Sequence, residues 1–185
     1  MECELKVLNI KVKEIESKLE QLGAKKLWAK EYKRILFDFE NKSLDKKDAW
    51  LRLRTDGKKT TLTYKQTMNR EIDGTKEIEI EVNNFKETME LLKQTGLTQA
   101  KYQESKRTRY AYKDITFDID EWPLIPPYLE IEAKTKQKVL EGLKILKLKN
   151  PETTTLHGRG IYKKYGLNID SYKKLGFKKQ EKIKT

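Results

Sequence analysis

Residues 77–82, Glu-Ile-Glu-Ile-Glu-Val, alternate acidic and apolar side chains over their whole length. A period of two is typical of a β-strand with one charged face and one apolar face. The same alternation occurs at Glu2-Cys3-Glu4 and at Glu130-Ile131-Glu132. A helical pattern of apolar residues follows each of these three segments, so the sequence predicts a loosely repeated unit in which a strand precedes a helix.

The three expected helices carry apolar residues three or four positions apart. These residues run from Val12 to Leu22, from Phe85 to Leu92 and from Val139 to Leu146, and the helices end at Gly23, at Gly96 and near Asn150-Pro151. Further strands are expected near residues 31–39, 48–55, 59–67, 104–112 and 114–120, which gives about eight strands in all. Asp56-Gly57 is a hairpin signal between two of them. Sequential antiparallel pairs dominate, so we expect an α+β fold.

The expected strands share one feature: one face of each is apolar and the other is charged, with acidic and basic strands kept separate. For a single strand, a solvent-exposed charged face would be the ordinary interpretation. The helices, however, need the apolar face to pack on, so they belong outside the sheet. The charged face then lies inside if the sheet closes. We therefore expect a closed, eight-stranded, mainly antiparallel β-barrel with a polar lumen and helices packed outside.

Composition limits the class of protein. The 185 residues suit one domain, and no stretch approaches the roughly 20 apolar residues of a membrane span. The N-terminus lacks the layout of a signal peptide, so a cytoplasmic location is the default expectation. A single cysteine, Cys3, excludes an internal disulfide and a cysteine-based metal site. Any bound metal would use oxygen ligands.

The net charge of +12 raises the question of nucleic-acid binding. Residues 134–185 hold 15 Lys and Arg against 4 Asp and Glu, out of 41 and 29 in the chain, so the excess is C-terminal. A basic tail usually gives solubility or weak attraction to polyanions. We expect one tunnel domain over residues 1–170 and a basic tail over residues 171–185.

The charged lumen points to a class of chemistry. Carboxylates that converge from several strands suit divalent cations such as Mg²⁺, which also binds substrate phosphates. Arginine and lysine opposite them suit phosphate oxygens. No Ser-His-Asp or Cys-His arrangement competes, and the only histidine, His157, lies outside the expected strands, which favours a structural or incidental role. Together these residues describe a polyphosphate that metal ions bridge to the protein.

The residues also resemble a known family. Glu2-x-Glu4-x-Lys6 is similar to the ExExK motif of the CYTH superfamily, the triphosphate tunnel metalloenzymes. Further similar segments follow in order, at residues 50–54, 62–66, 76–79, 106–110, 117–120, 128–132 and 161–166. The resemblance covers roughly residues 1–168. It implies an eight-stranded tunnel, dependence on Mg²⁺ or Mn²⁺, and activity on a triphosphate.

The resemblance also implies roles for individual residues. The implied metal ligands are Glu2, Glu4, Glu79, Asp118, Glu130 and Glu132. The implied phosphate-binding residues are Lys6, Arg52, Arg54, Lys65, Lys106, Arg107 and Arg109. Within the last three, strand parity favours Arg107 and Arg109 over Lys106. Glu4, Lys6 and Lys65 are the candidates for a direct part in catalysis.

The family activities leave three alternatives. The first is hydrolysis of a triphosphate such as tripolyphosphate, thiamine triphosphate or an RNA 5′ end. The second is a class IV adenylyl cyclase that converts ATP to cyclic AMP and pyrophosphate, for which the apolar loop Trp122–Pro127 could contact the base or only pack on the tunnel rim. The third is a non-catalytic binder of polyphosphate or RNA ends. We expect the hydrolase, as a monomer or homodimer.

Overall fold

The computed structural model describes residues 3–69, 72 and 74–183. The strands are β1 (Cys3–Val7), β2 (Lys25–Phe39), β3 (Ala49–Thr55), β4 (Thr60–Thr67), β5 (Thr75–Val82), β6 (Leu97–Tyr112), β7 (Ile115–Glu121), β8 (Tyr128–Ala133), β9 (Thr153–Thr154), β10 (Tyr172–Leu175) and β11 (Gln180–Lys182). The helices are α1 (Val12–Gln21), α2 (Phe85–Gln94), α3 (Lys136–Ile145) and α4 (Gly158–Lys164), with short 3₁₀ turns η1 (Asp45–Lys47) and η2 (Ile169–Ser171). The expected α+β class is confirmed.

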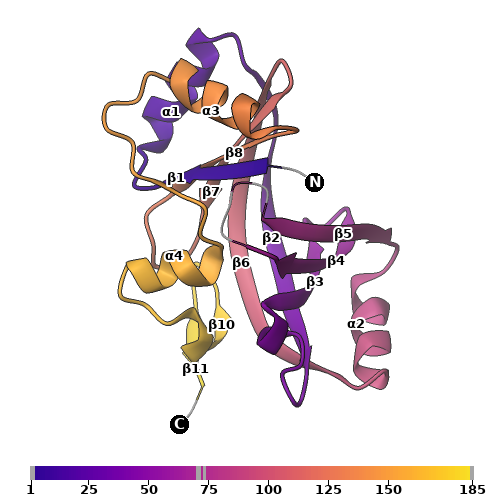
Figure 1. Ribbon diagram of the computed structural model, residues 1–185. Helices are drawn as coiled ribbons and strands as arrows, with labels where there is room; N and C mark the ends of the chain where they lie inside the picture. Colours follow the sequence, from indigo (N-terminus) through magenta and orange to yellow (C-terminus); the bar gives the residue numbers. More distant parts are fainter. Residues whose placement is uncertain (1–2, 70–71, 73, 184–185) are drawn as a thin grey trace.

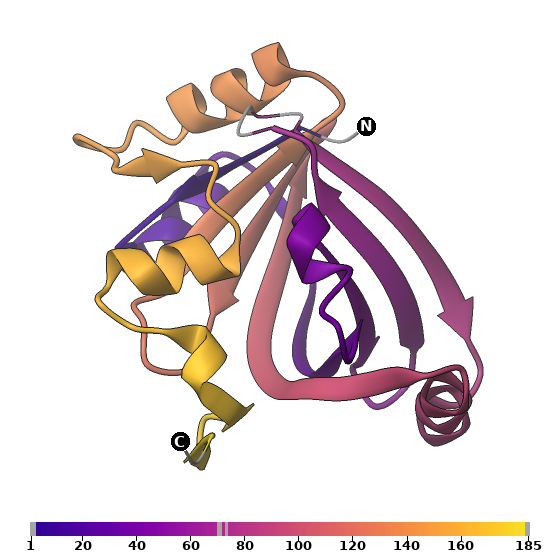
Figure 2. The same ribbon diagram turned by 60° about the horizontal axis from the view of Figure 1, so that its bottom comes forward.

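The strands form one curled sheet (Figures 1 and 2). Its order is β5-β4-β3-β2-β6-β7-β8-β1-β9, so the first eight strands of this path give the expected eight-stranded wall. All the pairings along it are antiparallel. β10 lies off this path and runs parallel to β6, with which it pairs at Lys174 and Leu175. The sheet therefore curves into a half-barrel whose concave face is the charged face predicted from the sequence.

The edges of the half-barrel approach each other at one point. Among the described residues, β5 and β1 form no ladder. The backbone N–H of Glu4 on β1 nevertheless donates to the carbonyl oxygen of Ile72, which lies just before β5, at 2.9 Å. This contact brings β1 close to the start of β5 at one end of the sheet, in the arrangement that a tunnel requires.

β2 and β6 are longer than the sequence indicated. The strands expected at 31–39 and 104–112 begin at Lys25 and Leu97, and the two pair along almost their whole lengths. The first halves of both strands lack a clean alternation of apolar and polar residues, so the sequence pattern underestimates the lengths of the strands. Pairing between the two strands supplies the backbone hydrogen bonds that hold these segments extended.

The helices cover the apolar outer face, as expected (Figure 1). Ile15 and Leu19 of α1 and Val139 of α3 are buried in one cluster with Phe117 and Ile131 of the sheet. Side chains of α2 pack in a second cluster with those of β3 and β6. The cover stops short of β5, where Ile78 and Ile80 on the outer face are 55% and 54% exposed.

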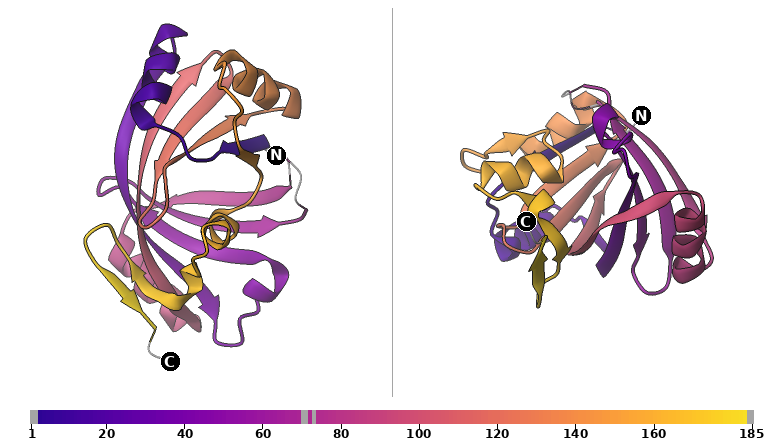
Figure 3. Two further views of the ribbon diagram at one scale, coloured as in Figure 1. Left: turned by 90° about the vertical axis from the view of Figure 1, so that its left-hand side faces the viewer. Right: turned by 90° about the horizontal axis from the view of Figure 1, so that it is seen from below.

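The C-terminal part of the chain returns to the sheet. α4 lies over the concave side (Figure 3), and its Ile161 and Tyr162 are buried with Tyr128 and Leu175. Residues 171–185, expected as a basic tail, include β10 and β11. None of the helices in the described part of the chain has the length and apolar character needed to cross a membrane.

Candidate functional site

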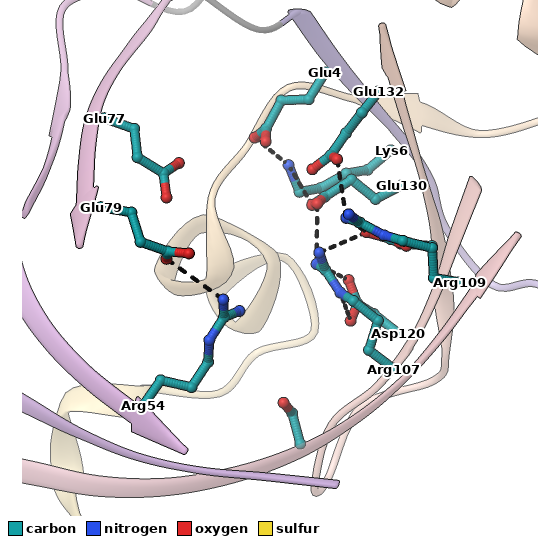
Figure 4. A network of polar contacts seen from close by, with 12 residues as sticks. Glu4, Lys6, Arg54, Glu77, Glu79, Arg107, Arg109, Asp120, Glu130 and Glu132 are labelled. Carbon is teal, nitrogen blue, oxygen red and sulfur yellow. Dashed lines mark hydrogen bonds and ion pairs between the residues drawn. The ribbon is translucent and has the colours of Figure 1, made fainter. Parts of the chain in front are cut away.

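A cavity of about 610 Å³ occupies the concave side of the sheet. Residues from all of the strands β1 to β8 line it, and residues 157–159 at the start of α4 contribute to its wall. Strand alternation places these polar side chains inward, because their apolar neighbours lie on the outer face of the sheet. The expected polar lumen is thus a real cavity, and Figure 4 shows its central contacts.

Three carboxylates meet on one wall. Glu4 on β1 and Glu130 and Glu132 on β8 each offer an oxygen within 4.8 Å of the others. The register explains the meeting, since Glu4 pairs with Glu132 and Lys6 pairs with Glu130. The Lys6 Nζ lies 2.6 Å from Glu4 Oε1 and 3.2 Å from Glu130 Oε2. Three of the sequence-predicted metal ligands therefore lie together, and two of them contact one buried ammonium group.

The electrostatics of this wall are strongly coupled. Burial raises the pKa of Glu132 well above its ordinary range, and the charge of Glu130 adds to the rise. Burial also opposes ionisation of Glu130, but Lys6 and Arg107 more than offset it and hold the pKa of Glu130 low. Burial lowers the pKa of Lys6, but the charges of Glu4 and Glu130 outweigh burial and raise this pKa above its ordinary value. The surroundings therefore favour the charged form of Glu130 and the neutral form of Glu132.

Arg107 and Arg109 on β6 lie beside the carboxylates. Arg107 Nη2 lies 2.9 Å from Glu130 Oε1, and Arg109 Nη2 lies 3.1 Å from Glu132 Oε2. Both arginines also bind Asp118, with Arg107 Nη1 at 2.6 Å from its Oδ2 and Arg109 Nε at 2.7 Å from its Oδ1. Asp118 is fully buried behind them and does not line the cavity. Its carboxylate thus holds the two arginines, apart from the three clustered glutamates.

The facing wall is basic. Arg52 and Arg54 on β3 and Lys65 on β4 line the cavity. Figure 4 shows Arg54, with Glu77 and Glu79, across the cavity from the glutamate cluster. Lys65 Nζ lies 2.6 Å from Glu77 Oε2, and Arg54 Nη2 lies 3.5 Å from Glu79 Oε2. These pairs are partly exposed to the cavity, so a phosphate can compete for the cations.

Glu79 belongs to this basic wall. The Thr63 hydroxyl donates to Glu79 Oε2 at 2.6 Å. Burial would raise the pKa of Glu79, but this hydrogen bond and the charges of Arg54 and Arg52 lower it below its ordinary value. The structure therefore does not bring Glu79 together with Glu4, Glu130 and Glu132.

Two aromatic rings on β2 support the arginines. The Arg109 guanidinium carbon lies 5.2 Å from the centroid of Trp28, and that of Arg54 lies 4.7 Å from the centroid of Tyr32. The two rings pack edge to face at 6.5 Å. Stacking of this kind fixes the plane of a guanidinium while leaving its N–H groups free to bind an anion.

Besides Asp118, one described site residue predicted from the sequence does not line the cavity. Lys106 points outward, where its Nζ lies 3.0 Å from Glu31 Oε1, as strand parity indicated. Glu2 lies outside the described residues.

Sequence reasoning missed several cavity residues. Arg34 on β2 and Gln103 on β6 could have been found, because alternation along each strand places them on the charged face. His157 and Arg159 also line the cavity, with the His157 ring 5.6 Å from that of Trp50. Their position depends on how α4 packs, which no local pattern reports.

The glutamate cluster fits a divalent cation. Its oxygens are hard ligands, and they converge from two paired strands to within 4.8 Å of one another. Glu4, Glu130 and Glu132 are the residues that would hold Mg²⁺ or Mn²⁺.

Comparison with known proteins agrees with this geometry. Residues 1–157 match the CYTH domain. The chain belongs to the CYTH family. No curated protein matches this CYTH chain. Solved structures with the same fold include protein PH1012 of Pyrococcus horikoshii OT3, at 25% identity and a TM-score of 0.69, over 82% of this chain and 94% of that one.

Two other solved structures share the CYTH fold. A conserved hypothetical protein of Pyrococcus furiosus is 22% identical, with a TM-score of 0.72 over 87% of this chain and 99% of that one. The Hippeastrum protein HpAC1, a candidate adenylyl cyclase described as having a dominant triphosphatase activity, is 16% identical, with a TM-score of 0.69 over 91% of this chain and 98% of that one. At these identities the likeness establishes the shared fold.

Proposed function

We propose that this CYTH protein binds a triphosphate in its cavity together with Mg²⁺ or Mn²⁺ and hydrolyses it. One observation carries the proposal: a cluster of three carboxylates, Glu4, Glu130 and Glu132, faces a wall of phosphate-binding cations across a single cavity. A binder of polyanions alone would gain nothing from the carboxylates, which repel its ligand unless a cation intervenes.

In this proposal the basic side chains hold the substrate. Arg52, Arg54 and Lys65 exchange their contacts with Glu77 and Glu79 for phosphate oxygens. The carboxylates they release remain nearby and keep the cations oriented. The arginine forks suit two oxygens of one phosphate, whereas lysine acts as a point charge.

The other wall positions the reacting phosphate. Glu4, Glu130 and Glu132 would hold the metal ion, which when bound neutralises charge that develops on the phosphates. Lys6, within 3.2 Å of two of these carboxylates, keeps them in place and adds positive charge at the same point. Arg107 and Arg109, fixed by Asp118, present their remaining N–H groups from the side.

A cyclase remains the second candidate, because aromatic surfaces line the same cavity. Trp50, Trp122 and His157 all contribute to its wall, and a nucleobase could stack on them. The phosphate-binding residues would be the same in both reactions. The difference would be the nucleophile, which is water in the hydrolase and the ribose 3′-hydroxyl in the cyclase.

Product analysis tests the proposal. The purified protein is incubated separately with tripolyphosphate, thiamine triphosphate and ATP, each with Mg²⁺, Mn²⁺ or EDTA. We expect orthophosphate release that requires a divalent ion. Cyclic AMP and pyrophosphate from ATP would instead establish the cyclase, and the lack of any metal-dependent product would leave only a binding function.

A further inference from the structure

Arg34 on β2 is a buried cation that forms no ion pair within the described part of the chain. Its side chain lines the cavity, yet the residue is only 7% exposed. Nη2 donates to the Ser105 hydroxyl, and Nε has no hydrogen-bond partner. Among the described residues, no carboxylate lies within ion-pair distance of it. A buried guanidinium is unfavourable in this state unless an anion reaches it.

The charges around Arg34 make its buried positive charge still less favourable without an anion. Burial lowers the pKa of Arg34 most, and the positive charges of Arg52, Arg54 and Arg107 lower it further. Asp120 is the carboxylate that opposes the effect, but Arg107 already binds both of its oxygens. The floor of the cavity therefore holds a local excess of positive charge between the glutamate wall and the basic wall.

Neighbouring groups can help to bind an anion there. Gln103 on β6 pairs with Arg34 in the sheet register, lines the cavity and is buried. Its carboxamide makes no hydrogen bond within the described chain. Trp122 stacks on the guanidinium, whose carbon lies 4.3 Å from the ring centroid, and this contact fixes its plane.

We propose that Arg34 and Gln103 form an anion-binding floor of the cavity that holds a phosphate group of the substrate. The proposal rests on the proposed function only in taking the anion to be a phosphate of a triphosphate chain. A neutral nucleobase would satisfy the hydrogen bonds but would leave the buried charge uncompensated. An anion would accept the hydrogen bonds and also compensate the buried charge.

Binding of tripolyphosphate in EDTA tests the floor without metal or turnover. Isothermal titration calorimetry compares the wild type with Arg34→Met and Gln103→Leu, which each remove a donor, and with Lys33→Gln. Lys33 is the next residue on β2 and is exposed on the other face, so its variant loses the same charge outside the cavity. We expect Arg34→Met to weaken binding about tenfold or more, Gln103→Leu to weaken it severalfold, and Lys33→Gln to leave it within about twofold.

Thermal unfolding separates this role from a structural one. Arg34→Met removes a buried unpaired charge, so without anion it should melt above the wild type. It should also lose most of the rise in melting temperature that tripolyphosphate gives the wild type. A structural arginine would predict a lower melting temperature and an unchanged rise.

Several results would overturn the floor site. They are unchanged binding by Arg34→Met, an equal loss in Lys33→Gln, or, if Arg34→Met does not fold, unchanged binding by Gln103→Leu. These outcomes are distinct from failure of the proposed hydrolysis. A protein that binds tripolyphosphate through Arg34 in EDTA but shows no turnover with any metal would retain the floor site and lose the enzyme.

Discussion

Arg107 and Asp120 form a two-bond fork across β6 and β7, with Nε 2.8 Å from Oδ1 and Nη2 2.5 Å from Oδ2. The carboxylate is 2% exposed, and Arg107 Nη2 also reaches Glu130. Arg107 therefore links the buried carboxylate of Asp120 to Glu130 in the glutamate cluster that lines the cavity. Asp120 acts through Arg107, because it does not itself line the cavity.

Asp120→Asn should destabilise the protein strongly. It replaces a charged partner of Arg107 by a neutral amide, and breaking a buried ion pair typically costs about 3–5 kcal/mol. The ion pairs of Arg107 with Asp118 and Glu130 offset part of this cost. Urea unfolding measures the change. Glu121→Gln, at the next position on the opposite face of β7, is the matched control and should cost about 0.5 kcal/mol or less. Equal stability of Asp120→Asn and the wild type would show that Asp118 and Glu130 alone satisfy Arg107.

Glu4→Gln should remove metal-dependent turnover. Mutation of a residue that only supports a metal ligand typically lowers metal affinity or activity by about 10- to 100-fold. Loss of a ligand itself should therefore lower kcat by at least about 100-fold. Arg52→Ala should instead raise KM for tripolyphosphate by about tenfold, because it removes a phosphate contact. Steady-state kinetics at varied Mg²⁺ distinguish the two effects. Glu20→Gln on the exposed face of α1 is the control, and equal activity of Glu4→Gln and the wild type would refute the metal assignment.

Much of the fold could be predicted because strand alternation reports a face directly. The apolar neighbours of Glu130 and Glu132 are fully buried, so the glutamates must point inward. The same parity separated Arg107 from Lys106. It would also have identified Arg34, since residues 31–39 were already predicted to form a strand.

The remaining features depend on tertiary contacts. His157 and Arg159 reach the cavity because α4 packs on Tyr128 and Trp122, and no sequence period encodes that packing. The pairing of Glu79 with Thr63 likewise follows from the register of β4 and β5. Alternation gives the face of a side chain, but it does not give the partner opposite it.

The Asp56 carboxylate should contribute to stability in a pH-dependent way. Burial would raise the pKa of Asp56, but hydrogen bonds from Lys30 and from the backbone N–H groups of Lys59 and Lys58 outweigh burial and lower it. The folded state therefore favours the carboxylate more than the unfolded state does. This stability is present above the unfolded pKa of about 4 and is lost as the pH falls through the lower folded pKa.

Asp56→Asn measures this contribution. At pH 7 we expect it to lower the free energy of unfolding by about 2 kcal/mol, the usual range for hydrogen bonds to a charged group. The difference from the wild type should shrink as the pH falls below about 4. Urea unfolding at pH 7, 4 and 3 gives the comparison, with the exposed Asp114→Asn as control. A difference that does not change with pH would show that the carboxylate charge is not responsible.

Gly142 on α3 packs closely against the sheet. A Cβ atom there would lie 2.9 Å from Ile131 Cγ2 and 3.0 Å from Ile115 Cγ2. Alanine favours a helix by about 1 kcal/mol over glycine, whereas overpacking a core costs about 1–3 kcal/mol. We therefore expect Gly142→Ala to lower the free energy of unfolding by about 1 kcal/mol in urea, against the helical trend. Gly158→Ala on α4, where no atom lies within 4 Å of the new Cβ, should cause no loss. A stabilised Gly142→Ala would mean that α3 can move away from β7 and β8 at little cost.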